Sequence, residues 1–232
     1  MGEQTTTGRI FEGQVLHLVV LAMLLTAVWI SAGQPAVTAG KFLGFSTGTW
    51  LALTVADAVA HQVYVWFCWR AELHGGTLTR WFGGRAFSLY ATLFTILFVA
   101  RPLLAFALGW SNRGTWDIYP WLGWSMALVL FVPVVYLMIS VRRYFTFRRA
   151  FGIDHFDPTY RSLPMVQEGI FRFSANAMYV FGFFMLWVPA FLFQSTAALV
   201  TAAFSHSYIW VHYYATEKPD MKRIYEMDVV AE

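Results

Sequence analysis

Charged residues are scarce in this chain. Only 12% of its 232 residues are Asp, Glu, Lys or Arg, whereas soluble domains carry about 25%. Hydrophobic residues make up 58% of the chain and aromatic residues 19%. This composition excludes a disordered chain and an ordinary soluble domain, and it is typical of a protein that lies in a membrane.

Cysteine is nearly absent as well. Cys68 is the single cysteine, which excludes a disulfide within the chain and a metal site built from cysteines. It also lies inside one of the long apolar stretches, so cysteine usage indicates nothing about the redox compartment.

Long apolar stretches account for more than half of the chain. Each matches the roughly 17–25 residues that cross the core of a bilayer as a helix. They lack the alternating pattern of barrel strands, and unpaired backbone groups are not tolerated in lipid. We therefore expect an all-α membrane bundle of about six transmembrane helices, at residues 15–33, 48–69, 86–109, 118–141, 173–193 and 196–214.

Basic residues are distributed unevenly among the loops that these six spans define. Of the 16 Lys and Arg residues, 13 fall on one side, Lys41 and Arg113 fall on the other, and Arg101 lies within the third span. Because positive residues mark the cytoplasmic side, we expect both termini and the 142–172 loop in the cytoplasm. The net charge of +3 then reflects topology, and no nucleic-acid partner is expected.

The 142–172 loop is the longest connection. Its paired arginines alternate with aromatic residues, which indicates either a basic amphipathic segment at the lipid headgroups or a plain positive-inside loop. Between the fifth and sixth spans almost no loop remains, so residues 193–196 must turn the chain on the opposite side and make the last two spans a tight hairpin.

Ionisable residues inside the spans are candidate functional residues, because they are costly in a membrane. Asp57 and His61 share a face of the second span and form either a pair that fixes the imidazole tautomer or a structural pair. We expect Arg101 to pair with Asp57 or to extend outward. The remaining candidates are three histidines: His17, His206 and His212.

One face of the sixth span carries His206, Trp210, Tyr213 and Glu217. Their spacing places them along one side of a helix. A lipid-facing surface would not be built from an imidazole, two polar-tipped aromatics and a carboxylate, so we expect this face to contact protein or a cavity.

Two segments of the C-terminal third resemble a known family. Residues 168–179 read EGIFRFSANAMY, and residues 213–225, after a short apolar hairpin, read YYATEKPDMKRIY. In order and spacing they are similar to the integral-membrane methyltransferases, which include the phosphatidylethanolamine N-methyltransferases and the isoprenylcysteine carboxyl methyltransferases. The resemblance covers about 60 residues.

Individual positions favour the phospholipid branch of that family. Asn176 and Tyr179 resemble its Asn-Pro-x-Tyr motif, and Glu217 corresponds to the first acidic residue of its Glu-Glu element. Ala177 replaces the motif proline, Lys218 replaces the second glutamate, and the chain has no Gly-x-Gly.

The resemblance implies a methyltransferase that uses S-adenosylmethionine and acts on a membrane lipid, with its active site facing the cytoplasm. The expected acceptor is the amine of a phospholipid headgroup. The implied cofactor-binding residues are Gly169, Arg172, Asn176, Tyr179, Tyr213, Glu217 and Lys218.

The chemistry of the residues agrees with this expectation. Methyl transfer requires the protein to position donor and acceptor, and it needs no metal. An ammonium group must first lose a proton to a carboxylate or an imidazole, which Glu217, His212 and His206 supply as catalytic candidates. Glu217 has a second possible role, binding the ribose or ammonium of the cofactor, and tyrosine rings can hold a sulfonium by cation–π attraction.

The sequence also leaves other functions open. Within the same family, the acceptor can be an isoprenylated thiol, a carboxylate or another small hydrophobic molecule. From other classes come a haem-binding electron carrier, with histidines as axial ligands, and a non-catalytic membrane protein. We expect residues 1–142 to form a four-span membrane region, and residues 143–232 to form the methyltransferase core from the cytoplasmic loop, the hairpin and the tail.

Overall fold

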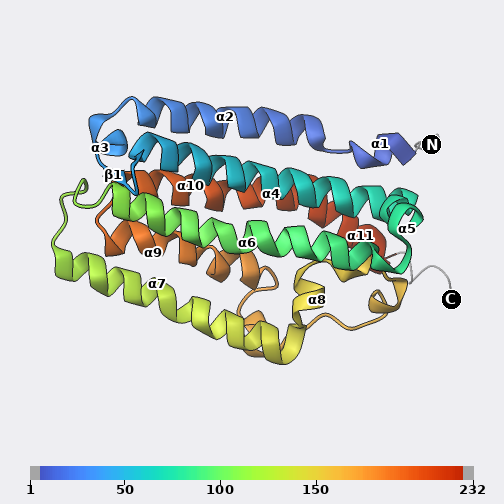
Figure 1. Cartoon of the computed structure of the whole chain (residues 1–232). Helices are drawn as coiled ribbons and strands as arrows, with labels where there is room; N and C mark the ends of the chain where they lie inside the picture. The colour runs from blue at the N-terminus through green and yellow to red at the C-terminus, as the bar shows by residue number, and fades with distance from the viewer. Residues whose placement is uncertain (1–5, 227–232) are drawn as a thin grey trace.

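The structure, a computed structural model, describes residues 6–226 and is almost entirely helical. Its long helices run side by side along one direction (Figure 1). The N-terminal part contains α1 (Thr6–Ile10), α2 (Gln14–Ala32), α3 (Pro35–Thr38), β1 (Lys41–Phe42), β2 (Phe45–Ser46), α4 (Thr47–Gly75), α5 (Thr77–Phe82), η1 (Gly83–Arg85) and α6 (Ala86–Ser111). The two strands pair antiparallel and are the only strands in the described residues.

The C-terminal part alternates long helices with short turns. Its elements are α7 (Pro120–Ser140), η2 (Val141–Phe145), α8 (Phe147–Ala150), η3 (Ile153–His155), η4 (Pro158–Tyr160), η5 (Gly169–Arg172), η6 (Met178–Gly182), α9 (Phe184–Leu192), α10 (Thr196–His212), η7 (Tyr213–Glu217) and α11 (Lys218–Glu226). Three of these turns, η2, η6 and η7, are π-helical. The expected all-α membrane bundle is confirmed.

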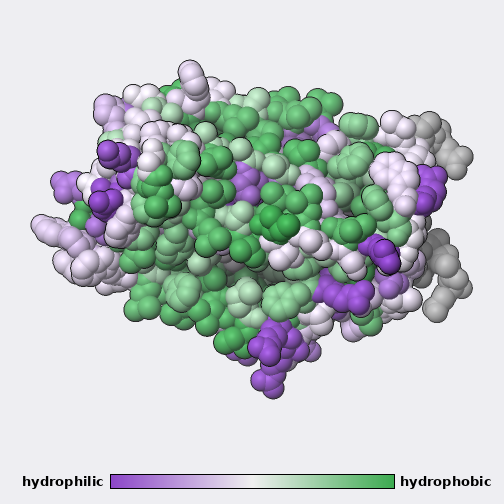
Figure 2. All heavy atoms as spheres, in the orientation of Figure 1, coloured by the Kyte–Doolittle hydropathy of each residue, from purple (hydrophilic) through white to green (hydrophobic). Residues whose placement is uncertain are grey.

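Four helical stretches are long and apolar enough to cross a membrane: Thr6–Ala32, Thr47–Gly75, Thr77–Ser111 and Pro120–Phe145. They match the first four expected spans except at residues 33, 118 and 119, and α4 continues as a helix beyond the expected end at residue 69 to Gly75. Large apolar side chains such as Trp29, Leu103 and Leu128 are exposed on their surfaces. Figure 2 shows hydrophobic residues through the middle of the visible face and most hydrophilic residues near its two ends. This is the surface that a bilayer requires.

The fifth and sixth spans differ from the first four. The fifth was expected from residue 173, but continuous helix runs only from Met178 to Leu192. The preceding residues instead form η5, where Ile170 and Phe171 are buried in a cluster with Leu137 and Val141 at the end of α7. The fifth crossing is therefore short, because packing against α7 outweighs the helical continuation of the apolar run.

Helix α10 lies at the centre of the bundle and packs against α2, α4, α6 and α9. Its buried face is built from small residues, including Ala197, Ala198, Thr201 and Ala202. Small residues let helix backbones approach closely, which is how helices associate in lipid. The central position explains why α10 is less apolar than α2, α6 and α7: α10 is covered by protein rather than by lipid.

The end of the bundle opposite the termini is fixed by hydrogen bonds between loops. The α9–α10 turn is as short as expected, with Leu192 ending one helix and Thr196 beginning the next. Asn112 Oδ1, after α6, accepts hydrogen bonds from Ser195 Oγ (3.0 Å) and from the backbone N–H of Ala197 (2.8 Å). These hydrogen bonds fix the α9–α10 hairpin relative to the end of α6.

Both ends of the described chain lie at the same end of the bundle. Figure 1 shows α1, α5, α8 and α11 there, with α3 and β1 at the opposite end. About half of the 13 basic residues lie on the first group of elements and the others on neighbouring turns or at helix ends, while Lys41 lies on β1 and Arg113 follows α6. The basic segments therefore lie at one end of the bundle. An even number of spans places both termini at that same end.

This arrangement predicts sidedness in a membrane. In a Cys68→Ser background, a cysteine at exposed Ser162 should react with an impermeant maleimide only from the cytoplasmic side, because positive loops stay inside. A cysteine at exposed Asp117, at the opposite end, is the matched control and should react only from outside. Labelling of position 162 from outside in intact cells would overturn the orientation.

Candidate functional site

The two motif segments meet through Tyr179 and Glu217. Tyr179 lies on η6 at the start of the fifth crossing, and Glu217 ends η7 after α10. The Tyr179 hydroxyl donates a hydrogen bond to Glu217 Oε2. Residues that are 38 positions apart in the sequence thus form one polar contact, and this contact joins the two motif segments.

Aromatic rings surround this contact. The Tyr179 ring meets those of Trp210 and Tyr213 edge to face, with centroids 6.1 and 5.9 Å apart, and Trp210 meets Tyr213 at 5.6 Å. Trp210, Tyr213 and Glu217 belong to the predicted polar face of the sixth span, and all three contact Tyr179 of η6. A carboxylate among several π-faces is a setting that favours a cation.

Glu217 is presented by a break in the regular helix, and the sequence explains the break. Pro219 has no N–H, so the Ala215 carbonyl four residues earlier loses its helical donor. The backbone widens into the π-turn η7, in which the N–H of Lys218 bonds to the Tyr213 carbonyl five residues back. Such π-turns are common at functional sites.

The environment of Glu217 favours its neutral form. Burial, together with the nearby carboxylates of Asp154 and Asp220, raises the pKa of Glu217 to about 8. A carboxyl with a pKa near the working pH exchanges a proton readily, which is the property that a general base needs.

Neither of the two predicted catalytic histidines lies at this contact. His206 lies on the same face as Glu217 but about three turns away along the helix, where it accepts a hydrogen bond from Trp187 Nε1 (3.1 Å) and stacks on Phe183. His212 is buried and lies near Trp69 of α4, with ring centroids 5.8 Å apart. Their catalytic roles stay predictions, and Glu217 alone of the three contacts Tyr179.

The other predicted cofactor residues make contacts of their own. Arg172 is exposed and stacks on Phe173, and Lys218 is exposed and lies over the Tyr214 ring, 5.4 Å from its centroid. The backbone carbonyl of Asn176 accepts hydrogen bonds from the N–H groups of Tyr179 and Val180 and so begins the helix that carries Tyr179.

Gly169 has a clear local role. Its φ is +61°, and an added Cβ would lie 2.5 Å from Ser140 Oγ. The same Ser140 hydroxyl accepts a hydrogen bond from the backbone N–H of Ile170 at 3.1 Å. Glycine is therefore needed for the motif segment to reach the end of α7.

A buried ionic cluster beside Glu217 was not predicted from the sequence. Arg70 Nε lies 3.2 Å from both carboxylate oxygens of Asp220, and both side chains are fully buried. His155 lies between Asp220 and Asp154, with its ring nitrogens 3.8 and 3.1 Å from their oxygens. Tyr225 donates to Asp154 at 2.9 Å.

The loop that delivers Asp154 and His155 is placed by α4. The His155 ring stacks on Trp69 with centroids 4.3 Å apart, and Gly152 packs so closely on Trp69 that a Cβ there would lie 2.4 Å from the indole. The positive-inside rule assigns Arg70 to a cytoplasmic loop, where an arginine is expected to be exposed. Its burial was therefore not expected. In the structure α4 continues past residue 69 to Gly75 and carries Arg70 as a buried residue of the helix.

The polar residues deeper in the spans form separate contacts. Arg101 pairs with Asp57 (3.6 Å), which confirms one of its two expected positions. The Asp57–His61 pair is not formed, and His61 Nδ1 has no hydrogen-bond partner among the described residues. His17 uses both ring nitrogens, toward Gln14 and Tyr208. Within residues 6–226 no group of three His, Cys, Asp or Glu is placed to hold a metal ion.

Comparison with known proteins identifies one family. The phospholipid methyltransferase family model matches residues 120–228, from the first residue of α7 through both motif segments. The family resemblance is thereby confirmed for this part of the chain. Neither the curated proteins nor the solved structures give a significant match.

The packing of Gly169 predicts a stability difference between two glycines. Gly169→Ala should destabilise the protein by about 1–3 kcal/mol, because the new methyl group overlaps Ser140. The control is Gly44→Ala, which has a φ of +81° but no atom within 4 Å of the new Cβ, so it carries backbone strain alone. Thermal unfolding in detergent compares them, and equal shifts would refute the close-approach argument.

Proposed function

We propose that this protein, whose residues 120–228 belong to the phospholipid methyltransferase family, transfers a methyl group from S-adenosylmethionine to the amine of a phospholipid headgroup. The family match indicates a membrane methyltransferase. We infer the cofactor and the acceptor from the chemistry of the site. The observation that carries the proposal is the Tyr179–Glu217 hydrogen bond inside a group of aromatic rings.

The residues at the site fit a positively charged donor. Bound S-adenosylmethionine would supply a methyl group on a sulfonium sulfur. The rings of Tyr179, Trp210 and Tyr213 present π-faces that attract such a cation, and Glu217 provides a compensating carboxylate. Gly169 and Asn176 shape the segment that carries Tyr179, and we propose that the exposed cations Arg172 and Lys218 bind the carboxylate end of the cofactor.

The acceptor amine must lose a proton before it can attack. An ammonium group has no free electron pair, so we assign Glu217 as the base that takes this proton. The freed nitrogen lone pair could then take the methyl group that bound S-adenosylmethionine would supply, and the electron pair of the former S–C bond would stay on sulfur. Glu217 releases the proton to water after the transfer. The pKa of about 8 suits this cycle, because Glu217 can both accept and release a proton near neutral pH.

The position of the site suits a lipid acceptor. Glu217 follows the membrane-crossing α10 at the end of the bundle that carries the basic segments. Lipid headgroups and a water-soluble cofactor meet at that depth. We propose that this end faces the cytoplasm and that residues 143–232 form the catalytic core, with residues 1–142 holding it in the bilayer.

Glu217→Gln separates the two roles open to this residue. If Glu217 is the base, turnover should fall on the order of 10²-fold or more, because the amide cannot accept the proton. Cofactor affinity, measured by calorimetry, should survive. If Glu217 instead binds the cofactor ammonium or ribose, affinity should fall by roughly 1.5–3 kcal/mol. Wild-type turnover together with wild-type affinity would remove Glu217 from the site.

The raised pKa of Glu217 also predicts how stability depends on pH. The carboxyl has an ordinary pKa of 4.5 and a pKa of about 8 in the fold, so between these values the folded state binds more protons than the unfolded state. The free energy of unfolding therefore falls as pH rises through this window. Glu217→Gln lacks this contribution and should lose less stability than the wild type between about pH 5 and pH 8. Thermal unfolding at several pH values measures the slopes, and equal slopes would contradict the shift.

A further inference from the structure

We propose that Arg70, which lies outside the family match, is the positioning residue for Glu217: it holds the π-turn on one side of that carboxylate and Asp220 on the other. This inference rests on the role proposed for Glu217. It adds a residue from the N-terminal region to the machinery of a site whose motifs all lie in the C-terminal part.

The π-turn leaves backbone carbonyls that need donors. Pro219 cannot bond to the Ala215 carbonyl, and an unpaired carbonyl in a buried position is costly. Arg70 Nη2 donates to Ala215 O at 3.0 Å and to Thr216 O at 3.3 Å. Gln14 adds bonds from its amide nitrogen to Ala215 O (3.4 Å) and to Thr216 Oγ1 (3.3 Å). The two residues directly before Glu217 are thus held from α4 and α2.

The same guanidinium also holds the residue one turn after Glu217. Arg70 Nε reaches both oxygens of Asp220. Its Nη1 bonds to the backbone carbonyls of Arg9, Ile10 and Glu12. One planar group therefore contacts the π-turn, α11 and the N-terminal segment together, which the single ammonium of a lysine cannot do.

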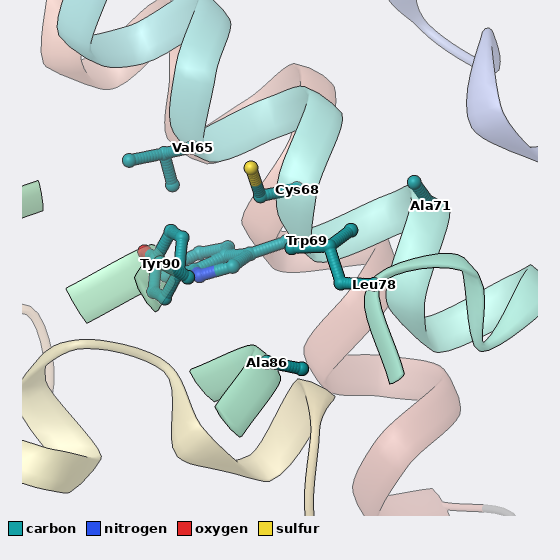
Figure 3. Packing of buried hydrophobic residues seen from close by; sticks show 7 residues of the cluster. All are labelled: Val65, Cys68, Trp69, Ala71, Leu78, Ala86 and Tyr90. Carbon is teal, nitrogen blue, oxygen red and sulfur yellow. The ribbon is translucent and has the colours of Figure 1, made fainter. Parts of the chain in front are cut away.

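Arg70 is itself held rigidly. Its neighbours Trp69 and Ala71 are buried in a hydrophobic cluster with Val65, Leu78 and Tyr90 at the end of α4 (Figure 3). The Arg70 side chain has no exposed surface. Because a misplacement of about 1 Å can lower a rate 10²-fold, a rigid clamp around Glu217 is a functional feature and not only a contribution to stability.

Arg70 also sets the charge around Glu217. The titratable groups that face Glu217 are Tyr179 of η6, Asp154 of η3 and Asp220 of α11. Arg70 offsets the negative charge of Asp220. Removing the arginine would leave Asp220 uncompensated and favour the neutral form of Glu217, whereas removing the charge of Asp220 would favour the ionised form.

The test uses three variants of the full-length protein in lipid nanodiscs, with methyl transfer measured across pH. Arg70→Lys keeps the charge but loses the paired bonds, so turnover should fall about 10- to 100-fold with little change in cofactor affinity. Arg70→Gln should move the pH midpoint of turnover upward, and Asp220→Asn should move it downward. A loss of stability alone would not move the pH midpoints of turnover of these two variants in opposite directions.

Arg101→Lys is the matched control, because Arg101 is also a buried arginine with a carboxylate partner, Asp57. It should lower thermal stability without moving the pH midpoint. Wild-type turnover in Arg70→Lys, or an unchanged midpoint in Asp220→Asn, would overturn the inference. If Arg70→Gln does not fold, the charge-conserving Arg70→Lys carries the test, because its turnover reports the position of Glu217 without the loss of a charge. If Glu217→Gln retains wild-type turnover, the proposed function itself fails, which is a distinguishable result.

Discussion

The structure around the site depends on one constraint: a buried backbone carbonyl must have a hydrogen-bond donor. Pro219 removes the donor that a regular helix would give to Ala215. The chain responds with the π-turn η7 and with Arg70 and Gln14, which bond to Ala215 from two other helices. The helix break that presents Glu217 and the contacts that join the N-terminal region to the C-terminal region therefore have a single cause.

The membrane solvent explains the rest of the architecture. In lipid there is no hydrophobic driving force to bury large apolar side chains. Such side chains therefore lie on the outside of α2, α6 and α7, while small and polar residues fill the centre. The central α10 combines both features: alanines allow close contact, and one polar face contacts η6 and α9. The site thus arises where the polar face that ends α10 meets η6, at the start of the short fifth crossing.

Much of this was predictable from the sequence. Apolar length located the spans, the basic loops gave the shared end of the termini, and helical spacing placed Trp210, Tyr213 and Glu217 on one face. The resemblance supplied Tyr179 as their partner. The Arg70–Asp220 pair was not predictable, because its residues lie 150 positions apart and each resembles an ordinary charge at the end of a span. The short fifth crossing was also missed, because hydropathy does not report that Ile170 and Phe171 pack on α7.

The most direct test of the account is transfer of a labelled methyl group. Purified protein reconstituted in vesicles that contain phosphatidylethanolamine is incubated with methyl-labelled S-adenosylmethionine, and the lipids are extracted and separated. Vesicles of phosphatidylcholine alone, whose headgroup nitrogen is already fully methylated, serve as the control. We expect label in a methylated phosphatidylethanolamine and none in the control. Folded protein that binds the cofactor but leaves the amine lipid unlabelled would contradict the proposed acceptor, and absence of cofactor binding would contradict the central claim.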